Sequence, residues 1–88
     1  MNKFSMSIQD MFLLIAGGTA KISISKALFI SKHLKLGSKV IIESTAAGGE
    51  IYTAYAFISN IEDENPADTA ANFLVSLDFI NYMEETNG

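Results

Sequence analysis

The sequence contains no group of side chains in a pattern typical of acid–base or nucleophilic catalysis. His33, the single histidine, falls in a lysine-rich segment with no acidic residue nearby in sequence. A Ser–His–acid site needs a carboxylate to orient the imidazole. We therefore interpret His33 as a polar residue beside a helix C-terminus, where positive charge is favoured. The chain has no cysteine, which removes thiolate nucleophiles, disulfides and thiolate metal sites.

Two groups of carboxylates and two glycine pairs do not have the pattern of an acid–base site or of a phosphate-binding loop. Glu62-Asp63-Glu64 lies just before Pro66, and Glu84-Glu85 lies next to a chain end, so both are typical of solvated charges rather than of acid–base pairs. Gly17-Gly18 and Gly48-Gly49 lack the downstream Lys and Ser/Thr of a phosphate-binding loop, and we interpret both as turns. We expect no enzyme, no metal site and no cofactor.

Charge divides the chain into a basic part and an acidic part. The formal net charge of the 88 residues is −4. Residues 21–39 contain lysines and no acid, whereas residues 62–85 contain acids and no base. This asymmetry suggests two surfaces with different partners, although it is equally typical of two solvated faces. The longest apolar run, residues 11–16, is too short to span a bilayer, so we expect no membrane partner.

The segment from Gly17 to Glu43 predicts a strand, a short helix and a second strand. Polar and apolar residues alternate over 21–24 at the strand period. Ser25 is a typical N-cap for a helix over 26–35, and Gly37 suits the left-handed conformation that ends a helix. A second strand is expected over residues 39–43. A turn at 46–49 would join it to a third strand over 50–59, so that the two strands form a hairpin.

The N-terminal part allows two interpretations. Residues 1–6 are expected to be a loose arm. Residues 11–15 form a continuous apolar run that suits a buried strand, but Ser7 could instead cap a helix over residues 8–16. We prefer the strand, because of the resemblance described below.

A long helix is expected over residues 66–83. Asn65 is a typical N-cap and Pro66 suits the first helical position. Apolar residues recur at helical spacing in two stripes, which is more apolar surface than a surface helix requires. The stripes are Ala70, Phe73, Leu74, Leu77 and Ile80, and then Val75, Phe79 and Tyr82. Because the chain is short yet 49% hydrophobic, we expect this helix to lie between its own core and another chain, in a homodimer.

Residues 24–43, ISKALFISKHLKLGSKVIIE, resemble a segment of the swapped-hairpin DNA-binding domains of the AbrB and MazE type, I-P-K-A-L-x-x-x-L-G-L-K-x-G-D-K-V-x-I-E. Upstream, GGTAKISI is similar to the family's G-N-S-x-A-V-R-I, and Gly49-Glu50-Ile51 resembles its D-G-K-I turn. The likeness covers residues 11–57, about half of the chain. Ser23 and Ser25 stand where the family has its strand arginine and its proline.

The resemblance implies an α+β fold, a small interleaved β-barrel dimer of the swapped-hairpin type, with residues 11–15 as its first strand, a short helix after the second strand and a C-terminal helix. The alternative is an α-α-β-hairpin-α order. We divide the chain into a swapped-hairpin-like β domain over 1–60 and an acidic connector with an amphipathic helix over 61–88.

The function that the resemblance implies is a cytoplasmic, dimeric, antitoxin-like transcription regulator. Double-stranded operator DNA would be bound by Thr19, Lys21 and Lys26. A protein partner such as a toxin would be bound by Phe73, Leu74, Leu77, Ile80, Tyr82, Glu62, Asp63 and Glu64. The alternatives are a small acidic protein-interaction module without DNA binding, such as an inhibitor or anti-defence factor from a mobile element, and a structural subunit that only oligomerises.

Overall fold

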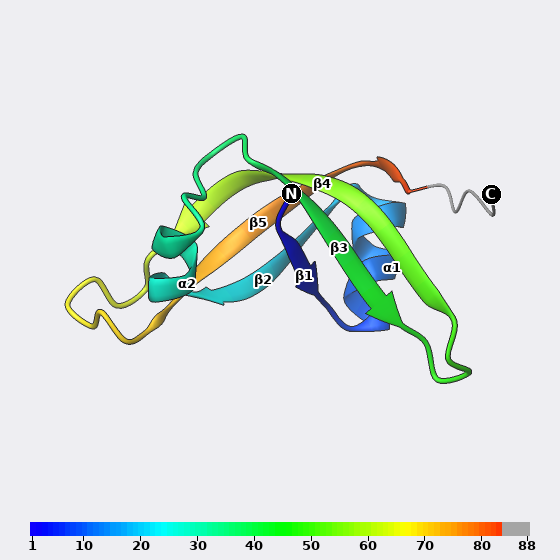
Figure 1. Ribbon diagram of the computed structural model, residues 1–88, viewed down its shortest axis with the longest axis horizontal. Coiled ribbons are helices and arrows are strands. Elements are labelled where there is room, and N and C mark those ends of the chain that lie inside the picture. The colour runs from blue at the N-terminus through cyan, green and yellow to red at the C-terminus, as the bar shows by residue number, and fades with distance from the viewer. Residues whose placement is uncertain (84–88) are drawn as a thin grey trace.

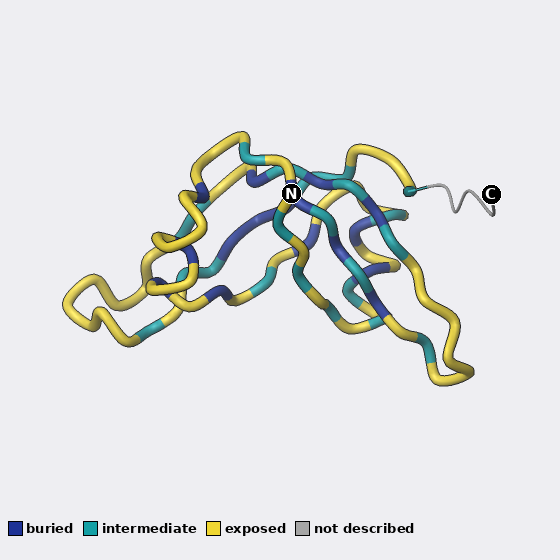
Figure 2. Tube along the Cα trace, viewed as in Figure 1, coloured by how far each residue is buried: buried dark blue, intermediate teal, exposed yellow. Residues whose placement is uncertain are grey.

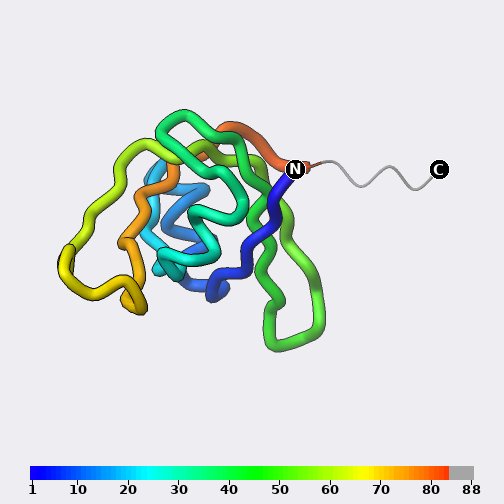
Figure 3. The backbone as a smooth tube through the Cα atoms, turned by 60° about the vertical axis from the view of Figure 1, so that its left-hand side comes forward, coloured from blue at the N-terminus to red at the C-terminus, as the bar shows by residue number. Residues whose placement is uncertain are grey.

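The computed structural model describes residues 1–83, which form one curled sheet of five strands with two helices (Figures 1 and 3). The sheet order is β1-β3-β4-β5-β2. Strands β1 and β3 run parallel, and the other neighbours run antiparallel. In chain order the elements are β1 (Lys3–Ser5), α1 (Ile8–Gly17), β2 (Thr19–Ser25), α2 (Lys26–Ser31), β3 (Lys39–Thr45), β4 (Ile51–Glu62) and β5 (Asn72–Tyr82). The fold class is therefore α+β, as predicted, and the sheet has the shape of a half-barrel.

The core lies on the inner face of the curl, where alternate residues of the central strands are buried. Helix α1 contacts β2, β3 and β5, so it lies inside the curl, and its Met11 and Leu14 are fully buried there. The tips of the molecule, at residues 47–50 and 63–70, are exposed (Figure 2). The sheet contributes Ala20, Ile24, Val40, Ile42, Ala54, Ala56, Ile58, Val75 and Leu77 to this core.

Several local predictions are confirmed. Strand β2 contains the predicted segment 21–24, and the Ser25 Oγ accepts a hydrogen bond from the Leu28 N–H at 3.1 Å. Gly37 has a φ of 86°, in the left-handed region that favours glycine. The hairpin of β3 and β4 keeps an unbroken register from Lys39↔Phe57 to Thr45↔Ile51.

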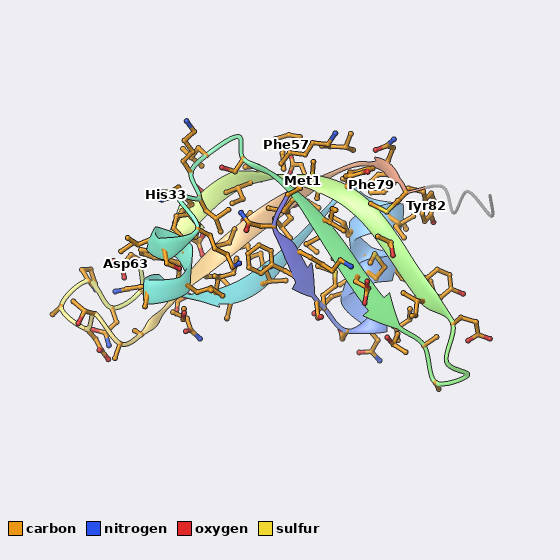
Figure 4. The ribbon with its side chains drawn as sticks, viewed as in Figure 1. Met1, His33, Phe57, Asp63, Phe79 and Tyr82 are labelled. Carbon is orange, nitrogen blue, oxygen red and sulfur yellow. The ribbon has the colours of Figure 1, made fainter. Side chains whose placement is uncertain are left out.

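Helix α2 is shorter than predicted. It ends at Ser31 rather than at Lys35, because Lys32 already leaves the helical region and His33 has a φ of 54°. His33 does lie just beyond a helix C-terminus, as expected (Figure 4).

The preferred strand over residues 11–15 is wrong, because this segment belongs to α1. The Ser7 Oγ accepts a hydrogen bond from the Asp10 N–H at 3.1 Å, so the alternative helix with its Ser7 cap is correct. The predicted loose arm over residues 1–6 is also wrong in part. Residues 3–5 form β1, and its Phe4 packs against the core.

The predicted helix over residues 66–83 is wrong, and so is the final helix of the alternative order. Residues 65–71 turn, with the Asp68 N–H donating to the Asn65 carbonyl, and residues 72–82 form β5. The apolar residues Phe73, Val75, Leu77 and Phe79 share one face at the two-residue period of a strand. Strand β5 pairs with both β4 and β2, so its backbone groups are satisfied between two neighbours.

The predicted boundary at residue 60 falls inside β4, and β5 belongs to the same sheet as the segment before it. Residues 84–88, with the acids Glu84 and Glu85 of the predicted C-terminal unit, lie outside the described residues. Within residues 1–83, neither helix has the length and apolar character needed to cross a membrane.

Candidate functional site

Lys26, predicted to contact DNA, is instead buried against the connector between β4 and β5. Its side chain is only 8% exposed, and its Nζ lies 2.7 Å from the Asp63 Oδ1. The same Nζ donates hydrogen bonds to the carbonyls of Asn65 at 2.7 Å and Asp68 at 2.9 Å. The ammonium also lies 5.5 Å from the centre of the Phe73 ring. Lys26 therefore holds the connector in place, and its charge is not free for a phosphate.

Thr19 and Lys21 lie together on the exposed face of β2. The Lys21 Nζ lies 3.5 Å from the Glu62 Oε1, with both side chains largely in solvent. An exposed pair of this kind contributes little stability, but it reduces the positive potential at β2. The structure thus brings Thr19 and Lys21 together and sets Lys26 apart.

Acidic residues at the end of β4 and in the connector form ion pairs with lysines of the same chain. Glu62 pairs with Lys21 and Asp63 pairs with Lys26, whereas Glu64 is exposed. The basic and acidic segments that were expected to face different partners therefore neutralise each other in part, through the pairs Lys21–Glu62 and Lys26–Asp63.

Of the five apolar residues predicted to bind a partner, one is in the core, two are half-buried and two are exposed. Leu77 is 0% exposed, and Phe73 and Leu74 are half-buried. Only Ile80 and Tyr82, near the end of β5, lie at the surface. The Tyr82 ring packs edge-on against Phe79, with 5.6 Å between ring centres.

A group of exposed apolar residues lies on α1 and the neighbouring strand ends, and of its members the sequence interpretation named only Tyr82. On the outer side of α1, Phe12 is 53% exposed and Leu13 is 61% exposed. The Phe12 ring meets Tyr52 of β4 edge-on, with 6.1 Å between ring centres. Tyr82 pairs with Ala54, two residues from Tyr52 on the same face of β4, so it is a diagonal neighbour of Tyr52.

We call Phe12, Leu13, Tyr52 and Tyr82 the apolar patch. The sequence does contain a pattern that predicts the α1 part of this patch. The run of residues 11–15 is apolar at every position, so a helix there must present apolar side chains on its outer side as well as its inner side. The preference for a strand hid that consequence.

The apolar patch is an exposed surface without a detected pocket among the described residues. No pocket is found in the part of the chain that the structure describes, and small-molecule sites are concave. Residues 1–83 also contain no cluster of three or more His, Asp or Glu side chains placed to hold a metal ion. Exposed contiguous apolar side chains with aromatic rings are typical of protein–protein contacts.

Phe12 and Tyr52 come from elements far apart in the sequence, and the curl of the sheet brings them together. The Ser7 cap starts α1 and places Phe12 at its outer side, while the β3–β4 hairpin carries Tyr52 to the same end of the molecule. No family model, no curated protein and no solved structure matches this chain, so the functional argument rests on its own residues and their geometry.

Proposed function

We propose that this chain is a small, non-enzymatic protein-interaction module that binds a partner protein through the apolar patch. One observation carries the proposal: the exposed aromatic pair Phe12–Tyr52, flanked by the exposed Leu13. Aromatic side chains bring large contact areas to an interface at a low cost in side-chain entropy and are enriched among its energetically dominant residues. Phe12, Leu13 and Tyr82 are each more than half exposed although they are large apolar or aromatic side chains.

The surroundings of the patch suggest the chemistry of the partner. Asp10 precedes Phe12 on α1, Glu50 precedes Tyr52 on the hairpin, and the formal net charge of the chain is −4. Interfaces combine an apolar centre with a polar rim, and opposite charges on the two rims speed association. The partner surface is therefore an apolar centre with lysine or arginine at its rim.

The antitoxin-like regulator is the second candidate, supported by the exposed Thr19 and Lys21 on β2. It is the weaker one, because Asp63 and two carbonyls hold the third predicted contact, Lys26. Its interleaved, swapped-hairpin dimer and its cytoplasmic location stay predictions. If this candidate is correct, Lys21→Glu abolishes retardation of double-stranded DNA in a low-salt gel; if the unmodified protein retards no DNA there, the candidate fails.

A matched pair of leucines tests the interaction module. Leu13 in the patch and Leu36 between α2 and β3 are both 61% exposed, so Leu13→Asp and Leu36→Asp change the same amount of exposed apolar surface. The immobilised protein would be used to isolate a partner from an extract of its source cells. The purified partner would then be titrated calorimetrically with the unmodified chain and with both variants.

We expect Leu13→Asp to weaken binding at least tenfold, because it places a charge in the centre of a dehydrated contact, which costs about 1.4 kcal/mol or more. Leu36→Asp should bind like the unmodified chain. Equal affinities for all three proteins would contradict the proposal, and so would a partner whose binding only Leu36→Asp disturbs.

A further inference from the structure

Among the described residues 1–83, strand β2 is an outer strand of the sheet and pairs on one side only, with β5. The Phe79 N–H donates to the Gly18 carbonyl at 2.9 Å, and the Lys26 N–H donates to the Ala71 carbonyl at 3.1 Å. Both bonds continue the register of the ladder, in which hydrogen-bonded pairs alternate with non-hydrogen-bonded pairs. The even-numbered residues of β2 therefore bond to β5.

The odd-numbered residues Thr19, Lys21 and Ser23 consequently direct their backbone N–H and C=O groups away from β5. All three are exposed, and no backbone bond joins them to another described residue outside the ladder. The free edge of β2 thus presents a row of donors and acceptors in the pattern that another strand requires.

This edge lacks most of the features that prevent strand addition. Such features are short length, proline, bulges and exposed charges. The opposite edge, β1, has only 3 residues, whereas β2 has 7 residues, no proline and an unbroken register with β5. Its single charged residue, Lys21, lies 3.5 Å from Glu62, which reduces its ability to repel another strand.

We propose that the occupant of this edge is a second copy of the chain, whose β2 pairs antiparallel with the first. The two-fold axis passes between the two Ile22 residues. In this register Ala20 faces Ile24 of the second copy on the inner face, and Lys21 faces Ser23 on the outer face. Apolar residues thus meet apolar residues, and no like charges stand directly opposite each other.

The neighbouring registers fit less well. Moving the axis to Lys21 places two ammonium groups directly opposite each other, which is unfavourable. Moving it to Ser23 leaves Ala20 opposite the buried Lys26 of the second copy. The Ile22 register also covers an apolar side chain that is only half-buried at the free edge.

One substitution and its matched control test this dimer by analytical ultracentrifugation. Ser23→Pro removes an N–H that points to the free edge and leaves the ladder with β5 intact, as proline at an edge position does. We expect a dissociation constant at least 100-fold higher than that of the unmodified chain. Ser23→Ala keeps the N–H and should dimerise normally.

Cysteine cross-linking tests the register, because the chain has no cysteine of its own. The two Ile22 residues would form a non-hydrogen-bonded pair with Cα atoms about 4.5 Å apart, within the range of a disulfide. Ile22→Cys should therefore form a disulfide-linked dimer under mild oxidation. In Ser25→Cys the two sulfurs would be about 20 Å apart, at about 3.3 Å per residue, and should not cross-link.

A monomer at millimolar concentration would overturn the proposal. A dimer whose dissociation constant Ser23→Pro leaves unchanged would also overturn it. That result is expected of an interleaved barrel, which would not depend on pairing between two β2 edges. A dimer that cross-links through Leu13→Cys but not through Ile22→Cys would place the contact at the apolar patch instead and also overturn it. The proposal is separate from the interaction module, because Leu13→Asp should leave the dimer intact.

Discussion

The ammonium of Lys26, at the start of α2, lies 2.7 Å from the carboxylate of Asp63, the first residue after β4. This ion pair and the hydrogen bonds from Lys26 to the Asn65 and Asp68 carbonyls tie the connector between β4 and β5 to the first turn of α2. A basic residue and an acidic residue that the sequence suggested for two different partners thus bind each other. Both are part of the fold.

Lys26→Met should lower the free energy of unfolding by about 2–4 kcal/mol, because Asp63 and two carbonyls would lose their buried donor. The control, Lys21→Met, removes an exposed pair and should cost less than about 1 kcal/mol. Urea unfolding followed by circular dichroism measures both. Combining Lys26→Met with Asp63→Asn should recover part of the loss, and similar costs for the two lysines would contradict the role of Lys26.

Substitution by alanine should change the free energy of unfolding in opposite directions at two adjacent glycines, Gly17 and Gly18. Gly18 has a φ of 83° at the C-terminus of α1, so Gly18→Ala should cost about 1 kcal/mol or more through backbone strain. Gly17 is helical, and a Cβ there meets no atom within 4 Å, so Gly17→Ala should stabilise by about 0.4–1 kcal/mol. The melting temperature of each variant, measured by thermal unfolding, distinguishes the two effects. A shift of the same sign for both variants would contradict a helix α1 that ends between Gly17 and Gly18.

Ser44 has a buried hydroxyl with no hydrogen-bond partner among the described residues. Ser44→Ala should therefore leave the free energy of unfolding unchanged or raise it by up to about 1 kcal/mol. Ser25→Ala is the matched control, because the Ser25 Oγ caps α2, and it should cost about 1 kcal/mol. If Ser44→Ala destabilised the protein as much as Ser25→Ala does, Ser44 would have to have a partner.

The sequence interpretation placed Leu77 on a partner-binding helix and Leu13 in a buried strand, and the two leucines should behave in the opposite way. Leu77 is 0% exposed and Leu13 is 61% exposed. Leu77→Ala should cost about 2–5 kcal/mol by leaving a cavity, whereas Leu13→Ala should stay within about 0.5 kcal/mol. The denaturant concentrations at the unfolding midpoints of the two variants measure these losses of stability directly. A small loss for Leu77→Ala would argue against β5 as a central strand.

The local signals of the sequence were sufficient wherever one residue acts on its own backbone. Ser7 and Ser25 cap helices, Gly37 takes a left-handed conformation, and the turn at 46–49 closes the hairpin, because each interaction spans only a few residues. The interpretation failed over residues 72–82. There nearly every position from Phe73 to Ile80 is apolar, and such a run fits a helical stripe and a strand face alike.

By itself the sequence thus determined the helix caps, the hairpin turn and the β2–α2 junction, since these depend on short-range hydrogen bonds and backbone preferences. Only the tertiary structure decided that residues 72–82 are a strand, because the open edges of β4 and β2 satisfy its backbone on both sides. The tertiary structure also decided which charges and rings are available at the surface. Lys26 meets Asp63, and Phe12 meets Tyr52, across dozens of residues, and the curl of the sheet, which no local pattern encodes, brings each pair together.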